Sequence, residues 1–206
     1  MVGEEVQFHP GLRESDSTKI VGLISDTHIP VRAESIPKEV FKVFEDVEFI
    51  LHAGDLVSLS VIDELEQISP VLAVYGNMDE LNVRNKLPRM DSFKLFDWKI
   101  GVTHDPGTLF GIGKMREIAR QNKFDVLVYG DTHRPNAKWD ENFLFLNPGS
   151  PTDPIPPFIV KPSVALLARA RVTKSMTRMM IWNARLICES VGAFIGSLVF
   201  NHDVCR

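Results

Sequence analysis

Seven side chains that can bind a metal ion follow short apolar runs in the sequence. They are Asp26, His28, Asp55, Asn77, His104, Asp131 and His133. From His28 to Asp131 the successive gaps are 27, 22, 27 and 27 residues, which is about one strand and one helix each. Imidazole, carboxylate and amide groups without a thiolate suit Mn, Fe, Ni, Co or Zn ions. The residue types and their spacing therefore predict a metal centre.

The number of these side chains indicates more than one ion. Seven ligands exceed what a single ion of this type needs, and a central aspartate can bridge two. Two ions about 3.5–4 Å apart can hold a bridging hydroxide and clamp the attacking and leaving oxygens of a displacement at phosphorus. We therefore expect two divalent ions, Mn²⁺ first, with Ni²⁺, Co²⁺, Fe²⁺ and Zn²⁺ as alternatives, and hydrolysis of a phosphodiester or phosphomonoester.

Each signal alone has an ordinary structural explanation. An Asp-Thr-His sequence after a strand also forms helix caps and turns. Gly-Asp and Gly-Asn pairs are common in turns. The prediction of a metal centre rests on the order and spacing of the whole set.

The elements that would position these residues alternate between strands and helices. We predict strands at 20–24, 47–51, 71–75, 93–96, 99–102, 126–129, 143–146 and 164–167, and helices at 36–45, 58–68 and 110–122. This order favours an α/β fold with a parallel or mixed sheet and antiparallel strands added at the end. The carboxyl ends of the strands in an open α/β sheet border one crevice, so residues distant in sequence would converge there.

The motifs resemble those of the calcineurin-like metallophosphoesterases. They are Asp26-Thr27-His28, Gly54-Asp55, Gly76-Asn77-Met78-Asp79, Thr103-His104, Gly130-Asp131-Thr132-His133 and Asn147-Pro148-Gly149-Ser150. The resemblance spans about Lys19 to Leu167 and is greatest to the small phosphodiesterases of the YfcE type. It implies a four-layer αββα sandwich with a two-metal site at one edge.

The resemblance also implies a role for each predicted ligand. One ion would be held by Asp26, His28, Asp55 and His133, and the other by Asp55, Asn77, His104 and the residue at position 131. Asp55 would bridge the two ions. Asn77 and His104 would hold the second ion beside the phosphate and are the expected catalytic residues.

Two positions in the motifs depart from the family pattern. Asp131 stands where the family has a histidine ligand, and Pro106 stands where a second histidine is often found. The segment from Asp26 to Pro30 also resembles the metallophosphoesterase-fold subunit of the retromer coat. A scaffold for protein assembly is therefore the alternative to an enzyme.

Three neighbouring features have alternative interpretations. His52 either contacts a metal ligand or packs and supports the backbone, and we favour the second. Asp79 either hydrogen-bonds to a ligand histidine or caps a turn. Residues 147–150 are expected to form a structural turn beside the site.

The composition of the chain limits which binding partners and which cellular compartment are expected. The formal net charge is −4, and residues 161–206 carry seven Lys and Arg against two Asp and Glu, which leaves 16 against 25 in the first 160 residues. An acidic body favours a cation-binding site over a nucleic-acid groove. No apolar run is long enough to span a membrane, and the acidic N-terminus does not resemble a signal peptide. Two cysteines, Cys188 and Cys205, exclude a disulfide framework and favour the cytoplasm.

We divide the chain into three segments. Residues 1–18 form an N-terminal extension, 19–172 the metallophosphoesterase domain and 173–206 a divergent tail. The tail is rich in apolar residues, so it either packs on the body as one or two helices or forms a homo-oligomer contact. The expected substrate is a small phosphoester.

Overall fold

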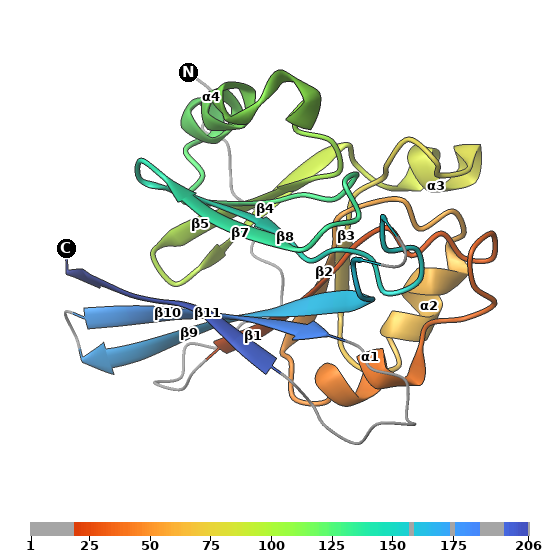
Figure 1. Cartoon of the computed structure of the whole chain (residues 1–206), viewed down its shortest axis with the longest axis horizontal. Coiled ribbons are helices and arrows are strands. Elements are labelled where there is room, and N and C mark those ends of the chain that lie inside the picture. Colours follow the sequence, from red (N-terminus) through yellow and green to blue (C-terminus); the bar gives the residue numbers. More distant parts are fainter. Residues whose placement is uncertain (1–18, 157–158, 174–175, 186–195, 206) are drawn as a thin grey trace.

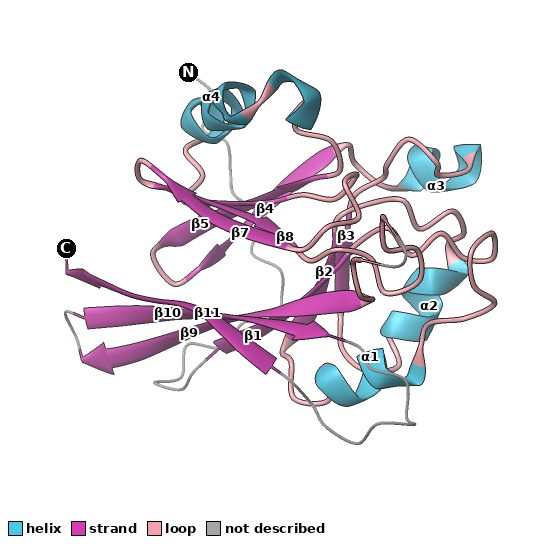
Figure 2. Ribbon diagram, viewed as in Figure 1, coloured by secondary structure: helices cyan, strands magenta, loops and turns pink. Residues whose placement is uncertain are grey.

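The computed structural model describes residues 19–156, 159–173, 176–185 and 196–205, with side chains up to residue 168. Two β-sheets face each other (Figures 1 and 2). The first has the strand order β11-β10-β9-β1-β2-β3 and the second β4-β5-β6-β8-β7. The first 18 residues, the proposed extension, lie outside the described part, as does Cys188.

The first sheet joins parallel strands near the N-terminus to antiparallel strands near the C-terminus. Its strands are β1 (Lys19–Ile24), β2 (Phe49–His52), β3 (Val71–Ala73), β9 (Ser163–Thr173), β10 (Met176–Arg185) and β11 (Gly196–Cys205). Strands β1, β2 and β3 run parallel, whereas β9 pairs antiparallel with β1. Strand β10 joins β9 to β11. The expectation of helices in the tail is therefore wrong for residues 176–185 and 196–205.

The second sheet has a parallel centre and antiparallel edges. Its strands are β4 (Met90–Leu95), β5 (Trp98–Thr103), β6 (Val126–Val128), β7 (Asn136–Asp140) and β8 (Phe143–Asn147). Strands β5, β6 and β8 are parallel, with β4 and β7 antiparallel at the two edges. Strand β7 was not predicted, because its side chains are exposed or half-buried and mostly polar.

Helices cover the outer faces of both sheets. They are α1 (Lys38–Val43), α2 (Ser60–Leu65), α3 (Leu81–Lys86) and α4 (Ile112–Asn122), with a short 3₁₀ helix at Thr108–Phe110. In Figure 1, α1 and α2 lie beside the first sheet and α4 beside the second. Helix α3 was not predicted, because its only buried residue is Val83 and it therefore shows no apolar periodicity. Among the described helices, none is long and apolar enough to cross a membrane.

Three apolar clusters hold the four layers together. The cluster between the sheets includes Val21 and Leu23 of β1 and Val126 and Val128 of β6. A second cluster packs the first sheet on α1 and α2, and a third packs the second sheet on α4. Because alternate residues of a strand point to opposite faces, a continuous apolar run is needed where both faces are covered. The predicted four-layer αββα sandwich is confirmed.

Candidate metal centre

The predicted ligands lie in loops at the carboxyl ends of the parallel strands. Asp26 and His28 follow β1, Asp55 follows β2 and His104 follows β5. The loops after β1 and β2 are joined, because Asp26 N donates to Gly54 O at 3.0 Å and His28 N donates to Asp55 O at 3.0 Å. The expected convergence of residues distant in sequence is therefore found.

Left-handed backbone conformations concentrate in these loops. Five of the seven predicted ligands have positive φ angles, namely Asp26 (54°), His28 (46°), Asp55 (57°), Asp131 (66°) and His133 (56°). Such a conformation costs a residue other than glycine about 1–3 kcal/mol and persists where surrounding contacts enforce it. Strain of this kind is typical of functional sites, which agrees with the predicted role of these loops.

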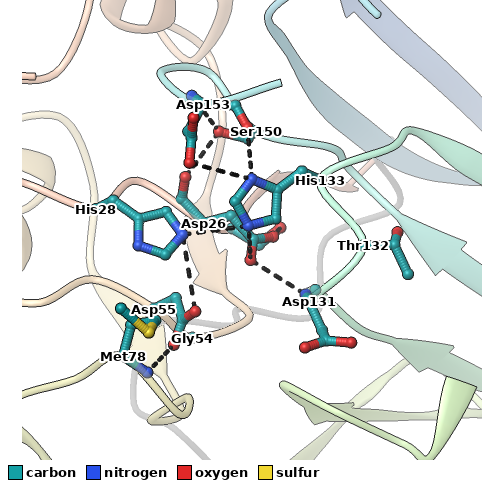
Figure 3. A network of polar contacts seen from close by, with 12 residues as sticks. Asp26, His28, Gly54, Asp55, Met78, Asp131, Thr132, His133, Ser150 and Asp153 are labelled. Atoms are coloured by element: carbon teal, nitrogen blue, oxygen red, sulfur yellow. Dashed lines mark hydrogen bonds and ion pairs between the residues drawn. The ribbon is translucent and has the colours of Figure 1, made fainter. Parts of the chain in front are cut away.

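The first candidate ligand group joins Asp26, His28 and His133, all of them buried. His28 Nε2 and His133 Nε2 lie 3.2 Å apart, and His133 Nε2 lies 3.4 Å from Asp26 Oδ1. Figure 3 shows the two imidazole rings turned toward each other beside the Asp26 carboxylate. The Nδ1 atom of His133 faces Asp153 O, which can only accept a hydrogen bond. The proton of neutral His133 is therefore on Nδ1, and the Nε2 lone pair is free to bind a metal.

The second candidate group joins Asp26, Asp55 and His104. His104 Nε2 lies 3.3 Å from Asp55 Oδ2, and His104 Nδ1 donates to Ala53 O at 2.8 Å. Asp26 belongs to both groups, whereas Asp55 Oδ2 lies near both His104 and His28, the latter at 3.7 Å. Two carboxylates therefore lie between the histidines of the two groups.

The electrostatics of the two groups fit divalent cations. Asp26 is fully buried, and burial raises the pKa of its carboxyl to about 6. Burial acts to lower the pKa of His104, but the carboxylates of Asp55 and Asp26 outweigh it and raise that pKa to about 9. The raised pKa of Asp26 comes from burial, which the charges of His104 and His133 offset only in part. A metal cation bound among these nitrogen and oxygen donors would stabilise the charged carboxylate further and would take the place of the proton on His104.

Three glycines make room for the His104 ring. A Cβ atom added at Gly54, where φ is +91°, would lie 2.7 Å from His104 Cβ, and one at Gly76 would lie 2.7 Å from His104 Cδ2. A Cβ at Gly130 would lie 2.9 Å from His104 Nδ1. The Gly-Asp and Gly-Asn pairs therefore do more than form turns, because the glycines let three loops approach one imidazole.

Asn77 and Asp131 lie at the edge of the centre. Asn77 is exposed, and its Oδ1 lies 3.1 Å from His104 Nε2. Asp131 Oδ1 is 4.0 Å from His104 Nε2, and Asp131 Oδ2 accepts a hydrogen bond from Thr108 Oγ1 at 3.3 Å. Figure 3 shows the Asp131 carboxylate directed away from His28 and His133. Asp131 belongs to neither candidate group.

The neighbouring residues support the loops. Asp79 accepts hydrogen bonds from the backbone N–H groups of Gly76, Asp55 and Val57 at 2.7, 3.2 and 2.5 Å. Of its two predicted roles, Asp79 therefore has the one of capping a turn. Ser150 Oγ donates to Asp26 O at 2.7 Å, and Asn147 Nδ2 donates to Gly130 O at 2.7 Å. The structural role predicted for residues 147–150 is confirmed.

His52 supports the backbone, as we expected. Its Nδ1 accepts a hydrogen bond from Gly54 N at 3.2 Å, so its Nε2 carries the proton and donates to Thr27 Oγ1 at 3.1 Å. Complete burial lowers the pKa of His52 to about 3. The imidazole is therefore neutral and locked in one tautomer at neutral pH.

This neutral histidine predicts a loss of stability in acid. The unfolded chain binds a proton at His52 below pH 6.5, whereas the folded chain does so only near pH 3. As the pH decreases from 6.5 to 3, protonation of His52 in the unfolded chain should therefore lower the free energy of unfolding by about 1.4 kcal/mol per pH unit. Urea unfolding at a series of pH values should show a smaller decrease for His52→Asn than for the wild type. Parallel decreases in the two proteins would refute this role.

The fold and this buried cluster define an α/β sandwich with candidate metal ligands at the strand ends. Residues 20–169 match the calcineurin-like phosphoesterase superfamily domain, and the chain belongs to that family. It is 42% identical over 151 residues to a probable metallophosphoesterase of Methanothermobacter thermautotrophicus, a match that covers 72% of this chain and 84% of that protein. It is 30% identical over 146 residues to a phosphodiesterase of Methanocaldococcus jannaschii, covering 63% of this chain and 82% of that protein.

Solved structures show the same fold. Vacuolar Protein Sorting 29 from Cryptosporidium parvum superimposes with a TM-score of 0.72 at 22% identity, covering 93% of this chain and 100% of that one. This identity shows a shared fold alone. The resemblances stated from the motifs are thus both confirmed, the first as family membership and the second at the level of the fold.

Proposed function

We propose that the chain is a divalent-metal-dependent phosphodiesterase that acts on small phosphoesters. The observation that carries the proposal is the buried set of Asp26, His28, Asp55, His104 and His133, whose nitrogen and oxygen atoms lie close together in two overlapping groups. Family membership supports the hydrolysis of a phosphoester. We propose two ions with Mn²⁺ preferred, because the set contains only imidazole and oxygen donors.

The position of each side chain suggests whether it would bind a metal ion or contact the substrate. Asp26, His28 and His133 would hold one ion, and Asp55 and His104 the other, with Asp55 between them. Divalent ions in such a centre supply Lewis-acid neutralisation of charge at phosphorus and a nucleophile at neutral pH. Asn77, at the exposed edge beside His104, would orient a phosphate oxygen through its amide.

The leaving group would have to depart without a dedicated proton donor. Position 106, where a second histidine is often found, is a buried proline, and the Asp105 carboxylate beside it accepts hydrogen bonds from Gly107 N and Thr108 N. General acid catalysis contributes about 10²–10⁴-fold where it operates. We therefore propose that activated diesters are better substrates than simple alkyl monoesters.

A scaffold for protein assembly is the second candidate. It is favoured by Pro106 and by Asp131, whose carboxylate lies outside both ligand groups. Hydrolysis of bis(p-nitrophenyl) phosphate with added Mn²⁺ separates the two candidates. We expect metal-dependent turnover that EDTA abolishes. Metal binding without turnover would favour the scaffold.

Asp131 provides a separate test of how the second ion is held. A third carboxylate lowers the net charge of a two-ion site, which weakens its Lewis acidity and its attraction for phosphate. We therefore expect Asp131→His to raise turnover with Zn²⁺ or Co²⁺ and to move the pH optimum downward. Asp131→Asn is the control, because it removes the charge without adding an imidazole. An unchanged metal preference and pH profile in Asp131→His would show that position 131 does not bind metal.

A further inference from the structure

A cavity beside His104 is larger than a phosphoryl group requires. Its volume is about 480 Å³, and its lining includes Asn77, His104 and Asp131 from the candidate centre. Cavities that enclose small organic ligands have volumes of about 300–1,000 Å³. The cavity therefore has room for the organic part of a substrate next to the metal centre.

Two arginines, Arg84 and Arg89, line this cavity, and they differ in their hydrogen bonding. Arg84 donates from Nε to Asp79 O at 2.8 Å and from a terminal nitrogen to Asn77 O. Its guanidinium therefore holds the loop that carries Asn77. The Arg89 side chain is exposed, and among the described residues its guanidinium has no hydrogen-bond or ion-pair partner.

The backbone at Arg89 is fixed although its side chain is unpaired. Tyr75 N donates to Pro88 O at 3.1 Å, and Thr103 Oγ1 donates to Arg89 O at 3.3 Å. Tyr75 follows β3, Thr103 ends β5, and both residues also line the cavity. Arg89 is therefore held in the cavity wall by the strands whose ends carry Asn77 and His104.

The acidic residues of the cavity are engaged by other groups. Asp105 Oδ1 accepts hydrogen bonds from Gly107 N at 2.6 Å and Thr108 N at 3.3 Å, and Asp131 Oδ2 accepts one from Thr108 Oγ1. The Arg89 guanidinium is consequently available to an anion from solution. A guanidinium binds phosphate and carboxylate groups through two parallel hydrogen bonds.

We propose that Arg89 is a specificity-determining residue that binds a second anionic group of the substrate, one that is not hydrolysed. This inference rests on the proposed function, because it assumes that the group undergoing hydrolysis is held at the metal centre. It narrows the substrate class to small phosphoesters of nucleotide size that carry two anionic groups.

Binding measurements test the proposal without turnover. Adenosine 3′,5′-bisphosphate and adenosine 5′-monophosphate are titrated by calorimetry into the full chain with Mn²⁺ present. We expect the wild type to bind the bisphosphate about ten- to a hundred-fold more tightly than the monophosphate. Arg89→Gln should lose this preference while its affinity for the monophosphate stays within about two-fold, and Arg89→Lys should restore part of it.

A matched control removes the same charge elsewhere. Arg120 lies on α4 and pairs with Glu141 at 3.1 Å, so Arg120→Gln should retain the preference for the bisphosphate. Equal affinity of the wild type for both probes would overturn the proposal, as would an equal loss for both probes in Arg89→Gln. Absence of phosphodiester hydrolysis together with an intact bisphosphate preference would refute the proposed function and leave the Arg89 subsite in place.

Discussion

Asp55→Asn should lower phosphodiester hydrolysis by a factor on the order of 10³ or more while the protein stays folded. Asp55 Oδ2 lies 3.3 Å from His104 Nε2 and 3.7 Å from His28 Nε2, so its loss affects both proposed ions. The asparagine keeps an oxygen that can accept the hydrogen bond from Met78 N at 2.7 Å. Steady-state kinetics, bound metal and the melting temperature should be measured on the same preparation.

Asp63→Asn is the matched control for this substitution. Asp63 is exposed on α2, so the variant loses the same charge away from the centre and should keep the parent's activity and metal content. Activity of Asp55→Asn close to that of the parent would show that Asp55 does not bridge the ions.

Gly76→Ala should disrupt the centre through space alone. The added Cβ would lie 2.2 Å from Asp55 Oδ1, 2.7 Å from Asp55 N and 2.7 Å from His104 Cδ2. Because all three atoms belong to the proposed ligands Asp55 and His104, the added methyl group can be accommodated only if these ligands move. We expect loss of metal binding and destabilisation of about 1–3 kcal/mol, measured by calorimetric metal titration and urea unfolding.

Gly113→Ala separates this effect from the general consequence of replacing a glycine. Gly113 lies in α4, and a Cβ there would meet nothing within 4 Å. This variant should bind metal normally and gain about 0.5–1 kcal/mol of stability, because glycine is a poor residue inside a helix. Normal metal binding by Gly76→Ala would contradict the packing described around His104.

The fold could be predicted where apolar runs cover both faces of a strand. Strand β1, with Val21 and Leu23 on one face and Ile24 on the other, is clear in the sequence because both of its faces are buried. Strand β7 was missed because its residues are exposed or half-buried and mostly polar, and helix α3 because most of its residues are exposed. The tail strands were missed for a different reason, since apolar content alone does not distinguish a strand from a buried helix.

The site could be predicted from its ligand types, but not in its details. The convergence of Asp26, His28 and His133 follows from their places at strand ends, which residue spacing reveals. The position of the Asp131 carboxylate depends on Thr108 Oγ1, a contact 23 residues away in sequence. Arg89 could not be singled out from the sequence, because it lines a cavity formed by residues from several strands and loops.

Restoring metal to the chelated protein tests whether the chain is a two-metal phosphodiesterase. Mn²⁺ is added in steps, and bound ions per chain and hydrolysis of bis(p-nitrophenyl) phosphate are measured on the same samples. We expect hydrolysis to increase with the number of bound ions and to reach its maximum at two ions per chain. Full occupancy without hydrolysis, or no Mn²⁺ bound at any concentration, would contradict it.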